Sequence, residues 1–412
     1  MSSGLEIYLL FLPFLFLIMG LEVYFLLKKK QSVNKHAYVV NIISSFAMGL
    51  IDILVMTHIL GQYKHFSKIS LFIMPNTWFT HVLALLTLDF VLWCSHYLGH
   101  KLPFFWSIHG VHHQPEEYNL SVGLRQPWIH KAYSVLFYWT MALIGVPLEI
   151  LQSVYSLVVV SQFWTHTTFI PKEIPVLSWI LMTPSQHRVH HGRNEVYIDK
   201  NFGLMFSLWD RLFKTYHPET EAVDFGTNEK FEKTNGLWAN LFPLILFIKK
   251  AAIASSGGKL FAYLIGRHRI LLNTEDPYRK LIEEKRMDDV VNEILYSFPY
   301  YLVQNILLVG LSFFVLTNPL PLDQKLAMVV GLILSYGIVG LLGDRKVLGR
   351  TLELPRILSL IYLCSAINEI LCLTLLVVQF VSFGIFYYLH SEKSLRQAWF
   401  NLFSNARTDY DL

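Results

Sequence analysis

The stretch "SIHGVHHQPEEYNL", residues 107–120, contains three histidines in the spacing H-x-x-H-H. The same spacing returns 78 residues later, counted from His109 to His187, in "SQHRVHHGRN", residues 185–194. Ten of the 17 histidines lie within residues 96–191, where an even distribution over the chain would place about four. The histidines are therefore concentrated in one part of the chain and arranged at regular intervals.

The chain around these histidines is apolar. Of its 412 residues 53% are hydrophobic and only 16% are charged, and the mean hydropathy is +0.41, whereas soluble domains have about 25% charged residues. Several apolar runs reach the roughly 20 residues that cross a bilayer as a helix. This predicts an all-α, polytopic transmembrane protein. The net charge of +4 is too small to indicate nucleic-acid binding.

The apolar segments expected to span or lie on the membrane are 5–27, 38–60, 77–98, 132–151, 153–170, 237–248, 251–266, 297–317, 324–343 and 356–389. The first lacks a basic n-region and a small-residue cleavage site, so it is expected to remain as a helix. The segments 237–248 and 251–266 are short for spans and are expected at the interface. The last is long enough for a bent helix or two short ones.

Three parts follow from this order. Residues 1–236 are expected to form a catalytic membrane domain, residues 237–296 interfacial segments with a charged connector at 267–289, and residues 297–412 C-terminal transmembrane helices. The basic residues Lys28, Lys29, Lys30 and Lys35 follow the first span, and the positive-inside rule places them in the cytosol. Counting spans from there predicts that both H-x-x-H-H copies face the cytosol.

The histidine spacing predicts short helices. His96 and His100 in "HYLGH" are four residues apart, and each H-x-x-H-H triplet also repeats at helical intervals, so each set shares one helix face. Pro103 is expected to interrupt the helix that carries "HYLGH". Before the second triplet, Thr183 or Ser185 can cap a helix whose first turn contains Pro184.

Eight imidazoles in three clusters predict a site for two metal ions with open coordination positions, because imidazole suits zinc, copper, iron and nickel. We predict catalytic and metal-ligating roles for His96, His100, His109, His112, His113, His187, His190 and His191. His166, in "FWTHTTFIP", is a predicted ninth ligand or a partner of a ligand, and His130 is a weaker candidate. The three cysteines lie in apolar runs without a C-x-x-C pair, so they predict neither disulfides nor a thiolate site. The spacing alone does not separate zinc from iron.

The three histidine clusters resemble those of the membrane-bound fatty acid hydroxylases, a superfamily that includes the sterol desaturases and C-4 sterol methyl oxidases. The text between them is similar to the ether-cleaving monooxygenases of this superfamily, notably "EEYNLSVGLRQ" at 116–126, "QFWTHT" at 162–167, "TPSQHRVHHGRN" at 183–194, "DKNFG" at 199–203 and "WDRLF" at 209–213. The resemblance implies two iron ions, O₂ and tetrahydrobiopterin, and an ether-lipid substrate in the endoplasmic reticulum membrane. It implies hydroxylation beside the ether oxygen of alkylglycerols and lyso-alkyl lipids, which releases a fatty aldehyde.

One position departs from this pattern. Members of the superfamily often have glutamate after H-x(3)-H, where this chain has Lys101, which cannot ligate a metal or orient an imidazole. Glu116, Glu117, Asp89 and Asp199 are the candidates for the missing carboxylate, and Asp89 is the preferred one because it lies near the face of His96. Arg125, Arg188, Arg193 and Asn194 are candidates for head-group or pterin binding, or for structural pairing.

Other functions fit less well. A sterol or fatty-acyl hydroxylase or desaturase of the same superfamily, supplied by a haem electron carrier, is the principal alternative. A metal transporter would distribute ionisable residues along several spans, whereas here the histidines gather at one side. A metal-bound scaffold without catalysis is suggested only by Lys101. The sequence does not predict the oligomeric state.

Overall fold

The computed structural model describes residues 3–30, 33–227, 235–266, 298–344, 346–379 and 381, and every regular element in these ranges is a helix. Two isolated β-bridges, Leu181 with Phe206 and Gly192 with Phe225, are the strand-like pairings within them. The all-α prediction is therefore confirmed. The contacts divide the chain into two compact units, residues 1–285 and 286–412. The three-part division made from the sequence stays a prediction, and its connector at 267–289 lies outside the described residues.

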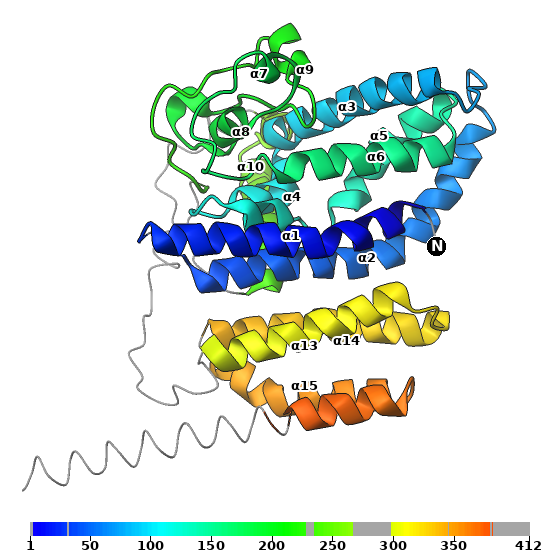
Figure 1. Cartoon of the computed structure of the whole chain (residues 1–412), viewed down its shortest axis with the longest axis vertical. Coiled ribbons are helices and arrows are strands. Elements are labelled where there is room, and N and C mark those ends of the chain that lie inside the picture. Colours follow the sequence, from blue (N-terminus) through cyan, green and yellow to red (C-terminus); the bar gives the residue numbers. More distant parts are fainter. Residues whose placement is uncertain are drawn as a thin grey trace, which may run out of the picture. The chain divides into compact units, whose positions relative to one another are not determined.

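The first unit contains all the predicted histidine clusters. Its helices are α1 (Ser3–Lys28), α2 (Lys35–Ser67), α3 (Trp78–Lys101), α4 (Pro103–His113), η1 (Leu120–Leu124), α5 (His130–Leu143), α6 (Leu148–Phe163), α7 (Leu177–Ile180), α8 (Pro184–His191), η2 (Glu195–Tyr197), α9 (Leu208–Leu212), α10 (Gly236–Ser256) and α11 (Leu260–Leu264). The long helices lie side by side, and α7, α8 and α9 form a loop-rich lobe at one end of α3 (Figure 1). The histidine-bearing end of α3 is thereby placed against this lobe.

The core of this unit is formed where α3 packs on α5 and α6. Its fully buried members include Leu88 of α3, Met141 of α5, and Ile150 and Val158 of α6. In a bilayer such packing stabilises through close van der Waals contact, because lipid tails are as apolar as a leucine side chain. This apolar packing fixes α3, and with it the positions of the histidines at its end.

Proline determines two of the helix boundaries near the site. Helix α3 ends at Lys101 and α4 begins at Pro103, where a proline in the first turn costs no hydrogen bond. Helix α8 begins at Pro184 after the N-cap residue Thr183, whose backbone N–H donates to the Gln186 side chain. Both boundaries were predicted from the sequence, and both are confirmed.

Two pairs of predicted segments are wrong in their bounds. The segments 237–248 and 251–266 are not separate, because α10 runs without a break over Gly236–Ser256 and is long enough to cross a membrane. Lys249 and Lys250 form part of this helix and do not interrupt it. The break predicted between the segments 132–151 and 153–170 comes earlier in the chain, between Leu143 and Leu148. Gly145, with φ +87°, allows this turn, since a Cβ there would lie 2.0 Å from the Phe72 carbonyl oxygen.

Pro243 removes one backbone hydrogen bond of α10, and the side chain of Gln114, which directly follows α4, replaces it. Pro243 has no N–H, so the carbonyl of Ala239, four residues earlier, lacks its helical donor. The Gln114 side chain donates to that carbonyl over 3.0 Å. This bond ties α10 to the residue that directly follows His113.

The second unit is described by α13 (Phe298–Thr317), α14 (Leu322–Gly343), α15 (Val347–Ser365) and a shorter helix at Glu369–Gln379. The segment 356–389 was predicted to form either one bent helix or two short ones. In its described part, α15 ends at Ser365 and a second helix begins at Glu369, so two helices are present. A buried polar group joins α13 to α15: Tyr300 donates to Glu353, which also binds Arg356 at 2.5 Å.

The protein is a multi-pass membrane protein by the length and composition of its helices. Among the described residues, α3, α10, α13 and α14 are long and apolar enough to cross a bilayer. The segments predicted at 5–27 and 38–60 are present as α1 and α2, and their crossing of the membrane stays a prediction.

Candidate metal centre

The nine predicted metal-ligating histidines come together in two buried groups. The first group, here the five-histidine group, contains His96, His100, His109, His113 and His190, and the second, the four-histidine group, contains His112, His166, His187 and His191. Within each group the candidate ligand atoms lie within 4.8 Å of one another. His130 belongs to neither group. The structure therefore gathers the imidazoles into two sets, the number expected for two ions.

Each H-x-x-H-H triplet is divided between the two groups. On α4, His109 and His113 belong to the five-histidine group and His112 to the other, and on α8 His190 is separated from His187 and His191 in the same way. A helix turns about 100° per residue, so positions i and i+4 differ by about 40° while i+3 lies about 60° to the other side of i. The triplet therefore fans out and can serve two neighbouring ions. The rings of His113 and His191 stack at 4.3 Å between the groups.

Backbone carbonyls orient four of the rings. The Nδ1 atoms of His96 and His190 donate to the carbonyls of Phe202 and Lys200, over 2.8 and 3.0 Å. In the four-histidine group, the carbonyls of Arg125 and Gln162 accept from the Nδ1 atoms of His112 and His166, each over 3.0 Å. A carbonyl oxygen can only accept, so Nδ1 carries the proton in these rings. The Nε2 atom of each neutral ring is then left with a lone pair for a metal ion.

The Nε2 atoms meet at distances that fit shared ions. His96 and His109 approach at 3.0 Å, His109 and His113 at 3.1 Å, and His166 lies 3.0 Å from His187. Two imidazole nitrogens bound to one ion at about 2.0–2.1 Å are separated by roughly 2.8–3.4 Å when the angle between them is about 90–109°.

Unpaired nitrogen atoms support the same interpretation. The Nε2 atoms of His100, His190 and His191 are buried without a hydrogen-bond partner, an unfavourable state for a polar atom unless it has another ligand. The nine residues therefore fit two metal ions of the kind that imidazole prefers.

Burial keeps these rings neutral. It lowers the pKa of His112 to about 4, although the Arg125 carbonyl that accepts from its Nδ1 opposes the shift. Burial also lowers the pKa values of His113, His166 and His191 well below the usual range, and the neighbouring imidazoles add to the effect. A metal ion therefore meets no competing proton at these rings near neutral pH.

Two glycines make room for the rings. A Cβ on Gly123 would lie 3.2 Å from Nδ1 of His166, and one on Gly99 would lie 3.4 Å from the ring of His109. Gly123 belongs to η1, whose start is fixed by the Asn119 side chain, which accepts from the Ser121 backbone N–H. The close packing of η1 against His166 was not predicted, because glycine in this short helix gives no sign of its neighbour.

The preferred carboxylate partner was wrong. Asp89 accepts from the backbone N–H groups of Met205 and Phe206 and from the indole of Trp209, so it anchors the segment before α9 and contacts no histidine. Asp199 pairs with Lys101 at 2.7 Å. Glu116 lies 3.8 Å from Arg193, and Glu117 accepts from the backbone of Asn34. Carbonyl groups supply the orientation that the sequence assigned to a carboxylate.

The candidate binding residues outside the histidines are engaged within the protein. The Arg125 guanidinium bonds to Val111, Gln114 and Asn41. Further pairs join Arg188 to Glu219, Arg193 to Asp224, and Asn194 to Glu221. These contacts support their structural role and not the head-group or pterin role.

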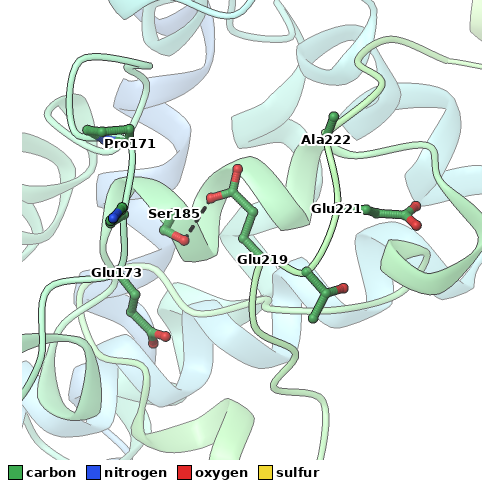
Figure 2. A pocket seen from close by; sticks show the side chains of 8 residues that line it. Pro171, Glu173, Ser185, Glu219, Glu221 and Ala222 are labelled. Carbon is green, nitrogen blue, oxygen red and sulfur yellow. Dashed lines mark hydrogen bonds between the residues drawn. The ribbon is translucent and has the colours of Figure 1, made fainter.

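The hollow in Figure 2 lies beside α8 but outside the histidine groups. It has a volume of about 450 Å³ and is lined by Pro171, Lys172, Glu173, Ser185, Glu219, Thr220, Glu221 and Ala222. Glu219 accepts from Ser185 at its wall and also binds Arg188. None of the nine histidines lines this hollow, so it is separate from the metal centre.

Residues 81–215 match the model of the fatty acid hydroxylase family, and all nine histidines fall inside this match. This part of the chain belongs to the fatty acid hydroxylase family. The family resemblance predicted from the histidine spacing is therefore confirmed. No solved structure matches the chain.

Curated relatives match part of the chain. Alkylglycerol monooxygenase of Xenopus tropicalis is 42% identical over 152 residues, which cover 37% of this chain and 33% of the relative. Alkylglycerol monooxygenase of Homo sapiens is 34% identical over 217 residues, which cover 49% of this chain and 46% of the relative. The ornithine lipid hydroxylase OlsE of Rhizobium tropici is 27% identical over 165 residues, which cover 39% of this chain and 50% of the relative. The aligned segments thus span between a third and a half of the length of these relatives.

Proposed function

We propose that this fatty acid hydroxylase family member is a di-iron monooxygenase that cleaves the ether bond of alkylglycerols and lyso-alkyl lipids, with O₂ and tetrahydrobiopterin as co-substrates. The observation that carries the proposal is the pair of buried, carboxylate-free histidine groups at one end of α3. The similarity to two alkylglycerol monooxygenases over this region supports the choice of substrate.

The proposed reaction inserts one oxygen atom of O₂ into the C–H bond beside the ether oxygen, while the other atom leaves as water. Tetrahydrobiopterin supplies the two electrons. The product is a hemiacetal, which collapses to a fatty aldehyde and the free glycerol part. Two bound iron ions would supply the oxidant for this unactivated C–H bond, held by His96, His100, His109, His112, His113, His166, His187, His190 and His191.

The surroundings of the histidines suit such a substrate. Helix α3 is long and apolar enough to cross a membrane and carries His96 and His100 near its C-terminal end. An alkyl chain lying along α3 in the bilayer would bring its head-group end to the histidines. Holding the reacting carbon in place in this way can contribute roughly 7–11 kcal/mol to lowering the barrier.

We further propose that the enzyme resides in the endoplasmic reticulum membrane with its metal centre on the cytosolic side, and that residues 1–236 form its catalytic part. The lysines at the end of α1 and directly after it, Lys28, Lys29 and Lys30, support this orientation through the positive-inside rule. Cysteine labelling at position 29 in sealed vesicles tests the orientation.

A test of the proposal starts with metal content. The protein purified in lipid nanodiscs is expected to contain two iron ions per chain and to release fatty aldehyde from an alkylglycerol with O₂ and tetrahydrobiopterin. His112→Ala and His190→Ala remove one ligand from each group and should abolish turnover. His217→Ala, outside both groups, is the matched control. Turnover that persists in both ligand variants contradicts the proposal.

The same assay separates the alternative from the same superfamily. A sterol or fatty-acyl hydroxylase or desaturase would need a reduced haem electron carrier and would not act on the alkylglycerol with tetrahydrobiopterin alone. The match to an ornithine lipid hydroxylase shows that lipids other than ethers occur as substrates among the relatives. Ornithine lipid and fatty-acyl substrates therefore belong in the substrate panel.

A further inference from the structure

The loop between η2 and α9 contains a five-residue segment, Asp199–Gly203, that lies against the five-histidine group. Two of its carbonyls accept from that group: Lys200 from His190 over 3.0 Å, and Phe202 from His96 over 2.8 Å. His190 belongs to α8 and His96 to α3, and the two residues are 94 positions apart in the chain. The segment 199–203 therefore sets the ring orientation of two ligands that no regular element connects.

The segment has an unusual backbone. Asp199 and Asn201 both adopt left-handed conformations, with φ of +61° and +53°. Such values are unfavourable for residues other than glycine, although aspartate and asparagine tolerate them best. A backbone of this kind keeps its shape only when the surrounding structure holds it.

Asp210 holds the C-terminal end of the segment. Its two carboxylate oxygens accept from the backbone N–H groups of Phe202 and Gly203, over 2.8 and 2.7 Å. Trp93 of α3 and Thr215 donate to the same carboxylate. Asp210 thus joins the segment to the helix that carries His96.

Asn201 holds the middle and Lys101 the beginning. The Asn201 side chain donates to the carbonyls of Gln186 and His217 and accepts from the His217 N–H. Lys101, which directly follows the ligand His100, pairs with Asp199 through Nζ and Oδ2 at 2.7 Å. The lysine that departs from the family pattern therefore has a partner 98 positions later in the chain.

We propose that Lys101, Asp199 and Asp210 are positioning residues of the metal centre. They hold the segment 199–203 so that its carbonyls at 200 and 202 keep Nδ1 of His190 and His96 engaged and their Nε2 atoms directed at the ion of the five-histidine group. In the four-histidine group, the rings of His112 and His166 are oriented instead by the carbonyls of Arg125 and Gln162. The inference rests on the proposed function only in requiring that the histidines bind metal.

The first experiment needs no metal. Hydrogen exchange of the metal-free protein in nanodiscs should show the amides of Phe202 and Gly203 protected, and Asp210→Asn should increase their exchange because one carboxylate oxygen becomes an amide nitrogen. Asp89→Asn is the matched control, a buried aspartate of α3 that holds Met205 and Phe206. If the amides of residues 202 and 203 lose protection equally in Asp210→Asn and Asp89→Asn, the specific role of Asp210 is overturned.

The second experiment follows metal release. Protein loaded with Fe²⁺ or Zn²⁺ is mixed with a chelator, and His100→Ala and His187→Ala assign the two release phases to the two groups. Lys101→Met and Asp199→Asn should each speed release from the five-histidine group by about tenfold, and Asp210→Asn by about 10- to 100-fold. Release from the four-histidine group should stay unchanged.

Matched variants separate positioning from general destabilisation. Arg193→Met breaks the Arg193–Asp224 pair, which has the same 2.7 Å separation on the same lobe, and should leave both release phases unchanged. Lys101→Arg retains a cation and should restore the wild-type rate. Because Lys101 and Asp199 act through one contact, the double variant should release metal no faster than either single variant.

The outcomes distinguish this inference from the proposed function. Equal acceleration of both phases, or none in Lys101→Met and Asp199→Asn, overturns the positioning role. Normal metal binding without aldehyde formation contradicts the proposed reaction but leaves the positioning role intact. A wild-type protein that binds neither Fe²⁺ nor Zn²⁺ contradicts both.

Discussion

The Nε2 atoms of His112 and His166 lie 3.2 Å apart, although the two residues are separated by 54 positions in the chain. Both rings donate their Nδ1 proton to a carbonyl, so both Nε2 atoms carry lone pairs that face each other. Burial lowers the pKa of both residues, which disfavours a proton between them. A metal ion satisfies both lone pairs at this separation.

His166→Ala is therefore expected to empty one of the two sites. The four-histidine group would retain three ligands, and its metal affinity should fall by about 10- to 100-fold or more, so that protein purified with a chelator holds close to one ion per chain. Metal analysis by mass spectrometry gives the stoichiometry. His130→Ala, which alters a histidine outside both groups, should keep two ions. Two retained ions in His166→Ala would show that this ring is not a ligand.

The sequence predicted the ligand set more fully than the arrangement of the ligands. Helical spacing alone placed each H-x-x-H-H triplet on one face, and the structure shows the same faces. Helix geometry lets each triplet fan out, but which rings share a group depends on how α3, α4 and α8 meet, and this was not predicted. His166 was found because it is a histidine close to the others in sequence, although it follows α6 and belongs to no triplet.

Partners that act through the backbone could not be predicted. Every residue has a carbonyl, so nothing in "DKNFG" distinguishes the carbonyls of Lys200 and Phe202 as acceptors for His190 and His96. Asp89 was predicted from its helical position, but it lies about two turns before His96, and its carboxylate binds Met205, Phe206 and Trp209 instead. In the same way, the predicted segments 237–248 and 251–266 left out Lys249 and Lys250, whereas α10 continues through both residues.

Gly123→Ala is expected to disturb His166 through contact alone. The added methyl group would lie 3.2 Å from Nδ1 of His166 and 3.6 Å from Phe163, so the ring must shift away from the Gln162 carbonyl. Overpacking of this kind costs about 1–3 kcal/mol in unfolding free energy, and release of metal from the four-histidine group should accelerate about tenfold. Thermal unfolding and chelator kinetics measure the two effects.

The control for this variant is Gly61→Ala in α2. No heavy atom lies within 4 Å of the Cβ position there, so alanine should stabilise the helix by up to about 1 kcal/mol and leave metal release unchanged. If Gly123→Ala behaves like Gly61→Ala in both measurements, the close packing of η1 on His166 does not exist in solution.

Gln114→Ala should destabilise the first unit because it removes a hydrogen bond from each of two buried partners. The side chain donates to the Ala239 carbonyl and accepts from Arg125 at 2.5 Å. An unsatisfied buried carbonyl costs about 1–3 kcal/mol, which the apparent melting temperature in detergent reports. Pro243→Ala restores the N–H that the Ala239 carbonyl lacks, so the cost of Gln114→Ala should be smaller in that background. An equal cost in both backgrounds would rule out the compensating role of Gln114.

The buried ion pair of the second unit gives a prediction independent of the metal centre. Glu353 and Arg356 of α15 are exposed by only 3% and 1%, and Arg356 also donates to Gln304 of α13. Arg356→Leu leaves the Glu353 charge buried, which should lower stability by about 3–5 kcal/mol, whereas Glu353→Leu combined with Arg356→Leu should recover most of this loss. Thermal unfolding compares the two variants, and metal analysis should give two ions per chain in both. A double variant less stable than Arg356→Leu would mean that the pair itself stabilises the unit, since removing the unpaired charge would then have brought no gain.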